Sequence, residues 1–230
     1  MTMFLFRKNK IGDNGFLTGM TDAHSHILPG VDDGVRHMSE SLEILSRYEQ
    51  LGISEVWCTP HIMEDVPNET EKLRARFEEL KAAYKGPIAL HLAAEYMMDH
   101  LFDQRLAACD LLDHGGDGVR TLLVETSTYD PPMRFDNIMD EIKSKGFFPI
   151  LAHPERYYYI DDLDDYKRMH EKGIRFQLNL GSMAGMYGQE PLRKAKWLLS
   201  HGMYSYVGSD LHSRRMLEMI LAGRSFDKIW

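Results

Sequence analysis

Short clusters of histidine and acidic residues recur along this sequence of 230 residues. They combine imidazole nitrogens with carboxylate oxygens, which are ligands that divalent metal ions take up in proteins. Because each ion needs several ligands, a site for more than one ion must collect them from distant parts of the chain. The pattern therefore predicts a site for several metal ions and, with it, hydrolysis. The clusters are His24-Ser25-His26 followed by Asp32-Asp33, Thr59-Pro60-His61, His153-Pro154-Glu155-Arg156, and Asp210-Leu211-His212.

Each member of these clusters also has a simpler interpretation. A lone histidine after a strand more often lies at the surface or makes a hydrogen bond, so only the joint pattern supports a metal site. Glu95 and Glu125 each end an apolar segment and could pair with a lysine, but a carboxylate in such a place is costly unless it is paired or metal-bound. The remaining histidines lack a paired acid and are predicted to lie outside the site: His37, His91, His100, His114, His170 and His201.

Length and composition predict one soluble domain. With 43% hydrophobic residues the chain can bury a sizeable core, and its length suits a single α/β barrel. No apolar run approaches the roughly 18 residues that span a bilayer, and Met1–Lys8 does not have the form of a secretory signal. We therefore expect a cytoplasmic protein without a membrane span. A net charge of −8 argues against nucleic acid as a partner.

The two cysteines exclude one hydrolytic mechanism. A cysteine-based phosphatase needs an arginine six positions after its nucleophile to close a loop around phosphate. Glu64 stands at that spacing after Cys58, and Gly115 stands there after Cys109. There is also no CxxC pair, so we expect both cysteines to be core residues.

Short apolar or β-branched segments alternate with segments of helical period. We count about seven strands, which favours parallel pairing through right-handed crossovers, either in a closed barrel or in an open sheet. The predicted strands are Thr21–His24, Ile53–Cys58, Ile88–Ala93, Arg120–Glu125, Phe148–Ala152, Arg175–Asn179 and Ser205–Gly208.

The intervening segments predict helices with recognisable ends. Ser39 is expected to cap a helix that ends at Gly52, and Asn68 is expected to cap one that ends near Gly86. Gly115-Gly116 and Gly118 mark a turn, because no GK[ST] follows them. Further helices are predicted over Phe135–Lys145, Asp161–Lys172, Pro191–Ser200 and Arg214–Leu221.

The polar clusters stand at or just after the ends of the predicted strands. In a parallel barrel these ends meet on one face, where the loops that follow the strands build active sites. Six separate segments can therefore contribute to one point. They contain His24 and His26, His61, Glu95, Glu125, His153, and Asp210.

At these residues the sequence resembles a known family. The order HxH with a following DG, then TPH, AE, HPER and SDLH is similar to the PHP (polymerase and histidinol phosphatase) superfamily of metal-dependent phosphoesterases. More narrowly, three segments resemble the bacterial manganese-dependent protein-tyrosine phosphatases of capsule and exopolysaccharide operons: Asp22–Gly34, His153–Tyr157 and Gly208–His212. The resemblance runs from about Thr21 to about Leu221. It implies an N-terminal extension over residues 1–20 and a single phosphoesterase domain over residues 21–230.

The resemblance implies a fold and a set of metal ligands. The fold is a distorted seven-stranded (β/α)7 TIM-like barrel, the PHP fold, and the site is a centre for three divalent ions, manganese above all, with iron or zinc as alternatives. The first ion takes His24, His26, Glu95 and Asp210. The second shares Glu95 and adds Glu125 and His153, and the third takes Asp33, His61 and His212. Adjacent Asp32 is the alternative to Asp33.

The residues around the predicted ligands suggest how phosphate is held. Arg156 can offer its planar fork to two phosphate oxygens; its alternative is a salt bridge with Glu155 or Asp161. Arg214 or Arg215 could add a second contact. Tyr157, Tyr158 and Tyr159 are expected to pack near the rim, where they could stack on an aromatic leaving group.

The function that follows is hydrolysis of phosphotyrosine. The resemblance implies a protein partner, the tyrosine-rich tail of a bacterial tyrosine kinase that controls capsular or exopolysaccharide export. One alternative is a small-molecule phosphatase, such as one that acts on histidinol phosphate. The other is a metal-binding module that binds a partner without turnover, which the complete ligand set argues against.

Overall fold

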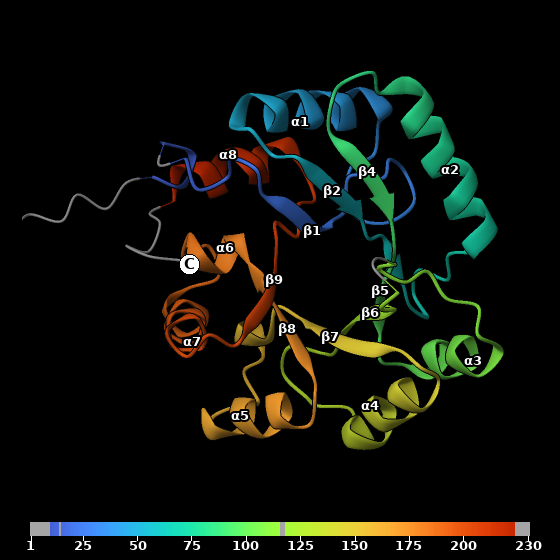
Figure 1. Ribbon diagram of the computed structural model, residues 1–230, viewed down its shortest axis with the longest axis vertical. Helices are drawn as coiled ribbons and strands as arrows, with labels where there is room; N and C mark the ends of the chain where they lie inside the picture. The colour runs from blue at the N-terminus through green and yellow to red at the C-terminus, as the bar shows by residue number, and fades with distance from the viewer. Residues whose placement is uncertain (1–9, 14, 116–117, 224–230) are drawn as a thin grey trace, which may run out of the picture.

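The computed structural model describes residues 10–13, 15–115 and 118–223, which alternate strands and helices along the chain (Figure 1). The strands are β1 (Thr21–Ser25), β2 (Glu55–Cys58), β3 (His61–Ile62), β4 (Ala89–Leu92), β5 (Glu95–Met97), β6 (Thr121–Glu125), β7 (Phe148–Ala152), β8 (Arg175–Asn179) and β9 (Tyr204–Gly208). The α-helices are α1 (Met38–Leu51), α2 (Thr70–Ala83), α3 (His100–Ala108), α4 (Phe135–Ser144), α5 (Asp164–Glu171), α6 (Leu180–Met183), α7 (Gln189–Ser200) and α8 (Arg214–Ala222). Two short 3-10 helices, η1 (Ile11–Asp13) and η2 (Pro154–Arg156), complete the order.

All pairings between these strands are parallel. The strands form one sheet in the order β1-β2-β4 and a second in the order β3-β5-β6-β7-β8-β9. Only two residues separate β2 from β3, and only two separate β4 from β5, so each pair continues one interrupted strand. Pro60, which has no N–H to donate, lies at the first break, but its carbonyl accepts from the Glu95 N–H at 3.1 Å. The described residues thus form seven strand positions.

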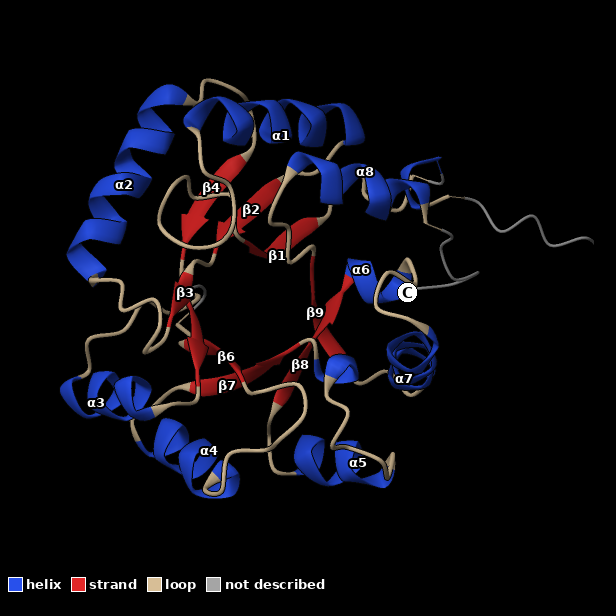
Figure 2. Cartoon of the chain, turned by 180° about the vertical axis from the view of Figure 1, so that it is seen from behind, coloured by secondary structure: helices blue, strands red, loops and turns tan. Residues whose placement is uncertain are grey.

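Hydrogen bonds between the ends of β1 and β9 close the ring. The Asp210 N–H donates to the His24 carbonyl at 2.7 Å, and the His26 N–H donates to the Leu211 carbonyl at 3.0 Å. Figure 2 shows the strands as a ring with the helices outside it. The predicted α/β fold with seven parallel strands is therefore confirmed, and the closed arrangement is the one that the structure adopts.

Alternation of side chains along the strands separates two cores. In β6, Leu122 and Val124 face the large core beneath the helices, whereas Leu123 faces a small cluster with Ile150 and Ala152. This is the inward and outward alternation expected in a barrel. The helices contribute one apolar face each, and α1 buries Ile44, Leu45 and Tyr48.

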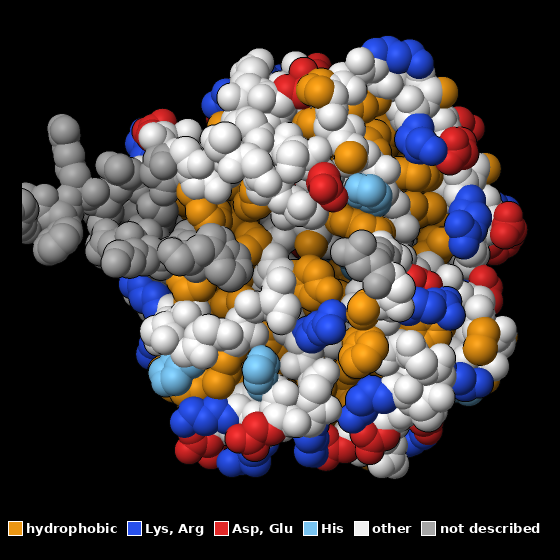
Figure 3. Space-filling model, viewed as in Figure 1, with side chains coloured by type: hydrophobic (Ala, Val, Ile, Leu, Met, Phe, Trp, Pro, Cys, Tyr) orange, Lys and Arg blue, Asp and Glu red, His pale blue; other side chains and the backbone are white. Residues whose placement is uncertain are grey.

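Charged side chains cover the outer surface. Lys72 pairs with Glu69 at 2.7 Å, and Lys167 pairs with Asp164 at 2.6 Å. On the face shown in Figure 3, acidic and basic side chains intermingle around the edge over the helices. Within the described ranges, no helix has both the length and the apolar character needed to cross a membrane.

Two of the predicted helix caps are wrong. Ser39 lies inside α1, whose N-cap residue is His37, and Asn68 precedes Glu69, the N-cap residue of α2. The Asn68 amide instead donates to the carbonyls of Val31 and His61, both at 2.9 Å. Asn68 therefore joins the loop that contains Val31 to the start of β3. The predicted C-cap is confirmed, because Gly52 ends α1 with a φ of 79°.

The expectation for one cysteine is also wrong. Cys58 is buried in β2, as predicted, but Cys109 is exposed. Cys109 ends α3, a helix that the sequence analysis did not predict, in a left-handed conformation with a φ of 54°. The start of α3 carries a recognisable signal, because the Asp99 carboxylate accepts from the Phe102 N–H at 2.9 Å.

The segment before β1 contacts the end of the last helix. Ile11 is buried, and its N–H donates to the Gly223 carbonyl at 2.9 Å. Met1–Lys8 and Gly116 lie outside the described residues. The division into an extension over residues 1–20 and a domain over residues 21–230 stays a prediction.

One glycine shows how closely the strands approach beside the site. A Cβ at Gly208 would lie 2.4 Å from the His24 Cβ and 2.8 Å from the Gln177 Nε2. We expect Gly208→Ala to lower the free energy of unfolding by about 1–3 kcal/mol, because β1 and β8 would have to move. Gly115→Ala is the control, since its Cβ meets nothing closer than Asp113 Oδ1 at 3.6 Å. Denaturant unfolding of both variants checks this, and equal stabilities would contradict it.

Candidate metal centre

The predicted ligands come together at the carboxyl ends of the strands. His24 lies in β1 with His26 just after it, and Glu125 is the last residue of β6. His153 follows β7 directly, and Asp210 follows β9 after one residue. Since β3 and β5 continue interrupted strands, His61 and Glu95 also stand on the same side of the barrel.

Four side chains form the buried centre of this cluster. The Nε2 atoms of His24 and His26 lie 3.1 Å apart. Both face Glu95 Oε2, at 3.2 and 3.3 Å, and both face Asp210 Oδ1, at 3.5 and 3.4 Å. The four ligand atoms therefore surround one point, as the predicted first ion requires.

A second group lies on the other side of Glu95. Its Oε1 atom is 3.1 Å from His153 Nε2, and Glu125 Oε2 is 3.8 Å from the same nitrogen. The His61 Nδ1 atom also faces this group, at 3.1 Å from Glu95 Oε2 and 3.3 Å from Glu125 Oε1. Glu95 Oε2 faces both the first group and His61, while Oε1 faces His153, so this carboxylate lies between two sets of possible ligand atoms, as a bridging carboxylate does.

A third group lies toward solvent. Asp33 Oδ1 is 3.6 Å from His61 Nε2 and 3.5 Å from His212 Nε2. The Asp33 side chain is 69% exposed, unlike the buried carboxylates of the first group. His26 lies near these three residues and connects the third group to the first.

Asp32 has a different position from Asp33. Its side chain is buried, and its Oδ2 atom lies 2.8 Å from His26 Nδ1 and accepts from the His61 N–H at 3.1 Å. Its Oδ1 atom accepts from the Gly34 N–H at 3.0 Å. Although burial opposes ionisation, the hydrogen bond to His26 lowers the pKa of Asp32. Because these contacts use both oxygens of Asp32, the geometry favours Asp33 as the ligand. Asp32 instead holds the His26 ring in its orientation.

The polar atoms of the cluster fit cations better than they fit each other. Glu95 Oε2 is buried and accepts no well-directed hydrogen bond, although three imidazole nitrogens lie within 3.3 Å of it. The His61 Nδ1 atom beside it is also buried without a hydrogen-bond partner. A divalent ion satisfies such a set of oxygen and nitrogen donors, because it accepts electron pairs from all of them.

Charge within the cluster shifts the protonation of its members. Burial disfavours a charged His24, but Glu95 and Asp210 raise the pKa of His24 to about 9. Burial likewise disfavours an ionised Glu95, but His24 and His61 hold the pKa of Glu95 well below its usual range. Glu95 is therefore ionised at neutral pH, and without metal ions a proton on His24 supplies positive charge beside it.

Two of the predicted ligands have unusual backbone conformations. His153 has a φ of 34° and Asp210 has a φ of 52°, both in the left-handed region that side chains other than glycine rarely adopt. The Asp210 N–H is held by the His24 carbonyl, and the His153 N–H donates to Gln177 Oε1 at 3.2 Å. Such strain persists where neighbouring contacts fix it, and it is concentrated at functional sites.

Sequence reasoning missed two polar residues of β8. Gln177 Oε1 lies 2.9 Å from His24 Nδ1, and the Asn179 amide donates to Asp210 Oδ2 at 2.7 Å. Both side chains are buried, so they position ligands without access to solvent. The signal was present in the sequence, because Gln177 and Asn179 occupy alternate positions of a strand whose other residues are largely apolar.

Arg156 lies at the edge of the buried cluster and is 25% exposed. Its Nη1 donates to Asp210 Oδ2 at 2.7 Å, and its guanidinium carbon lies 4.4 Å from the centre of the Tyr187 ring. Its partner is therefore neither Glu155 nor Asp161, the two acids weighed from sequence. Glu155 is buried and accepts from the Tyr204 hydroxyl at 2.9 Å. Tyr187, which follows α6, gave no signal in the sequence.

Arg214 and the three consecutive tyrosines, which the sequence also suggested for the site, do not all lie at the metal cluster. Arg214 donates to Glu43 on α1 at 2.7 Å, so this guanidinium has an acidic partner outside the cluster. Tyr157 is buried and stacks on Tyr159 at 5.4 Å between ring centres, whereas Tyr158 is exposed. Within the described ranges, the possible metal-binding groups contain none of the six histidines that were placed outside the site.

Comparisons with known proteins agree with this geometry. Residues 20–221 match the family model "Capsular polysaccharide synthesis, CpsB/CapC". The chain is 30% identical to the tyrosine-protein phosphatase YwqE of Bacillus subtilis (strain 168) over 199 residues, which cover 84% of this chain and 78% of YwqE. It is 26% identical to the putative tyrosine-protein phosphatase CapC of Staphylococcus aureus over 199 residues, 84% of this chain and 77% of CapC.

Solved structures give the same result for the fold. The chain superposes with a TM-score of 0.71 and 26% identity on a structure described with YwqE from Bacillus subtilis and CpsB from Streptococcus pneumoniae as unique metal-dependent tyrosine phosphatases. That match covers 86% of this chain and 81% of the other. The lactonase Lmo2620 from Listeria monocytogenes matches with a TM-score of 0.52 at 12% identity, over 91% of this chain and 83% of the lactonase, and shares the fold alone.

The raised pKa of His24 predicts how the metal-free protein responds to pH. A group whose folded pKa of about 9 exceeds its ordinary value of 6.5 adds stability below pH 6.5 that is lost as the pH rises through 9. We expect the melting temperature of metal-free protein to fall by roughly 5 °C across this window. As a predicted metal ligand, His24 would be deprotonated throughout in metal-loaded protein, whose melting temperature should therefore change much less. Calorimetry with and without chelator tests this, and a metal-free melting temperature that rises with pH would contradict it.

Proposed function

Because this chain belongs to the CpsB/CapC family of capsular polysaccharide synthesis, we infer that it is a metal-dependent protein-tyrosine phosphatase. The observation that carries this conclusion is the buried group of His24, His26, Glu95 and Asp210, with Glu95 shared between two sets of ligand atoms. A fold alone does not specify an activity, but a site that is assembled from six segments of the chain limits the possible chemistry.

We propose three metal positions with the ligands implied by the sequence. His24, His26, Glu95 and Asp210 hold the first ion; Glu95, Glu125 and His153 hold the second; Asp33, His61 and His212 hold the third. The close approach of these nitrogen and oxygen atoms supports the assignment. Their mixture of imidazole and carboxylate suits manganese, and it also accepts iron or zinc. When bound, the ions supply the nucleophilic water at neutral pH and neutralise charge on the phosphoryl oxygens.

The chain's own residues hold and orient the phosphate. Arg156 uses Nη1 for Asp210, so the remaining N–H groups of its guanidinium can donate to phosphate oxygens. The Tyr187 ring lies against the guanidinium and limits its rotation. Asn179 donates to the same Asp210 oxygen as Arg156, so Asp210 stays in place when the guanidinium shifts toward substrate. Arg156 therefore contacts substrate, whereas Tyr187 and Asn179 are positioning residues.

The proposed substrate is a tyrosine-phosphorylated protein, with the tail of a bacterial tyrosine kinase that controls capsule or exopolysaccharide export as the proposed partner. A phenolate is a better leaving group than an alkoxide, since its pKa lies near 10, so this site does not depend on a strong general acid. The two cysteines are free thiols, which fits a reaction in the reducing cytoplasm.

Metal removal tests the proposal directly. Prolonged dialysis against a chelator should abolish hydrolysis of a phosphotyrosine peptide, and manganese should restore it better than magnesium, because imidazole ligands favour transition metals. His153→Ala and Asp210→Ala should lose bound metal as well as activity, whereas His170→Ala, an exposed position on α5, should change neither. Metal analysis beside the assay distinguishes these cases. Full turnover after verified metal loss would rule out the mechanism.

Arg156 gives a second test that separates phosphate binding from metal binding. We expect Arg156→Ala and Arg156→Lys to keep their metal, because Asn179 still holds Asp210, but to lower kcat/KM by about 100-fold, the scale of a lost contact of ~3 kcal/mol. Wild-type protein should hydrolyse phosphotyrosine peptide faster than phosphoserine peptide or histidinol phosphate. Equal or higher efficiency on histidinol phosphate would favour a small-molecule phosphatase. Unchanged kinetics in the arginine variants would limit Arg156 to its ion pair with Asp210.

A further inference from the structure

A pocket of about 300 Å³ lies at the end of the barrel opposite the candidate metal centre. Its lining includes Thr21, Thr121 and Arg175, which are the first residues of β1, β6 and β8. By contrast, the predicted metal ligands His24 and Glu125 lie in the last two residues of β1 and β6. A volume of this size is at the lower end of the range for small-molecule sites, so the pocket suits a ligand of one or two rings. We call it the barrel pocket.

The barrel pocket and the metal centre are separated by apolar side chains inside the barrel. Along β6, Thr121, Leu123 and Glu125 stand at alternate positions, so their side chains lie on the same side of the strand. Thr121 lines the pocket, Leu123 belongs to the small inner cluster, and Glu125 belongs to the candidate metal centre. Tyr206 of β9 also lines the pocket and packs against that inner cluster. The barrel pocket is therefore a site of its own.

Aromatic side chains form the walls of the barrel pocket. Trp57 lines it from β2 and Tyr206 lines it from β9. Two imidazoles pack on Trp57, with ring centres 4.6 Å away for His91 and 4.7 Å away for His114. His114 is itself buried, and its Nε2 donates to the Ala23 carbonyl at 3.0 Å. Because these contacts hold the walls in place, binding a planar ring against them requires little further ordering of the protein.

Arg175 gives the barrel pocket a positive charge. Among the described residues, it is the only lysine, arginine, aspartate or glutamate that lines the pocket. Burial lowers the pKa of His114 to about 4, so that ring is uncharged at neutral pH. Arg175 Nη1 donates to the Tyr206 hydroxyl at 3.2 Å, and the guanidinium carbon lies 5.1 Å from the centre of the Phe148 ring, but no carboxylate in the described ranges pairs with it. The other N–H groups of this planar fork can therefore donate to both oxygens of a carboxylate.

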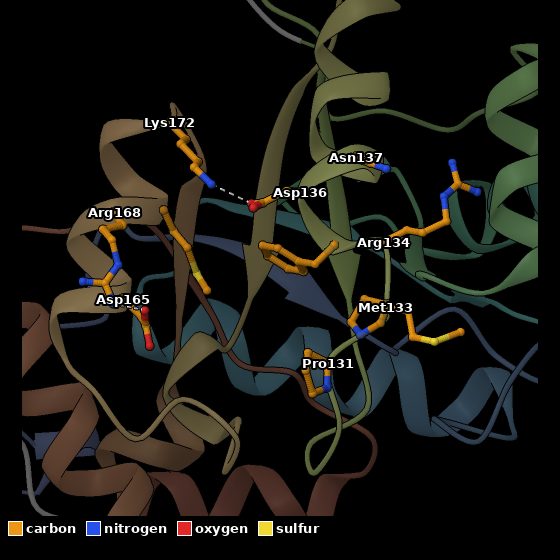
Figure 4. Close-up of a pocket in the computed structure, with 11 residues that line it drawn as sticks. Pro131, Met133, Arg134, Asp136, Asn137, Asp165, Arg168 and Lys172 are labelled. Atoms are coloured by element: carbon orange, nitrogen blue, oxygen red, sulfur yellow. Dashed lines mark hydrogen bonds and ion pairs between the residues drawn. The ribbon is translucent and has the colours of Figure 1, made fainter.

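A second groove differs from the barrel pocket because its charges are already paired (Figure 4). This groove has a volume of about 450 Å³ and lies between α4 and α5. Its three cations each have an acidic partner: Arg134 with Glu141, Arg168 with Asp165, and Lys172 with Asp136. The unpaired guanidinium of Arg175 therefore distinguishes the barrel pocket from this groove as a site for an anion.

We propose that the barrel pocket binds a small aromatic carboxylate, with its ring against Trp57 and Tyr206 and its carboxylate on Arg175. This site goes beyond the proposed phosphatase function and does not depend on it. The three side chains come from β2, β9 and β8, so it is the closed barrel that brings them together. The charge of the pocket selects an anion, and its aromatic walls select a planar ring over an alkyl chain.

Two probes of the same shape, 2-naphthoate and the neutral 2-naphthamide, test this proposal in ligand-observed NMR titrations. We expect metal-loaded wild-type protein to bind 2-naphthoate with a Kd of about 0.1–1 mM. The amide should bind about tenfold more weakly, equivalent to about 1.4 kcal/mol, because it offers Arg175 no charged partner. Arg175→Gln should weaken 2-naphthoate by about the same factor and remove the difference between the probes. Arg168→Gln removes a paired cation from the groove between α4 and α5 and is the matched control, which should bind both probes as wild type does.

Inorganic phosphate separates the barrel pocket from the metal centre, where a carboxylate could also bind. Saturating phosphate should leave the Kd of 2-naphthoate unchanged. Trp57→Leu should weaken both probes by about fivefold, because it removes an aromatic wall and keeps the charge of Arg175. A thermal melt of each variant shows that it is folded.

Three results would overturn the proposal. One is displacement of 2-naphthoate by phosphate together with unchanged binding in Arg175→Gln, which would place the probe at the metal centre. Another is equal affinity of wild-type protein for the two probes. The third is the absence of binding at a probe concentration of about 10 mM, far above the expected Kd.

Discussion

The structure depends on balancing the negative charge of carboxylates that are buried at one end of the barrel. Glu95 and Asp210 share a small space and are almost entirely removed from water. Their mutual repulsion in such a place is too costly without positive charge close by. Protons on His24 and its neighbours supply this charge in the metal-free protein, and metal ions supply it in the active one. Ligand protonation, metal binding and stability are therefore properties of the same group of atoms.

The barrel positions this group through its backbone as much as through its side chains. His153, directly after β7, and Asp210, one residue beyond β9, both have left-handed backbone conformations, and their side chains reach the buried cluster. The left-handed conformation of Asp210 is fixed by a backbone hydrogen bond to His24, itself a proposed ligand. β8 supports both sides of the centre, because Gln177 contacts His24 and the His153 backbone, while Asn179 holds Asp210. β8 contributes no proposed ligand, but its side chains hold three proposed ligands in place: His24, His153 and Asp210.

The sequence predicted those features that depend on local pattern. Seven strands follow from apolar runs, and the ligand clusters follow from their positions at the ends of those runs. Features that depend on distant contacts were missed or predicted wrongly. Asn68 has the residue type of a helix cap, but its amide is used by carbonyls of Val31 and His61. The partner of Arg156 is 54 residues away at Asp210, and Tyr187 reaches Arg156 from a loop without a recognisable motif.

The exposure of side chains increases from the proposed metal ligands toward the residues at the edge of the site. The residues proposed to hold the first ion are buried, so their geometry is independent of what approaches from solvent. Arg156 is intermediate: it donates to the buried Asp210, its guanidinium lies against the Tyr187 ring, and its side chain is partly exposed. Tyr129 and Tyr158 are exposed on the loops after β6 and β7, where their rings stack on each other. Substitutions at these exposed positions therefore leave the buried contacts among the proposed ligands in place.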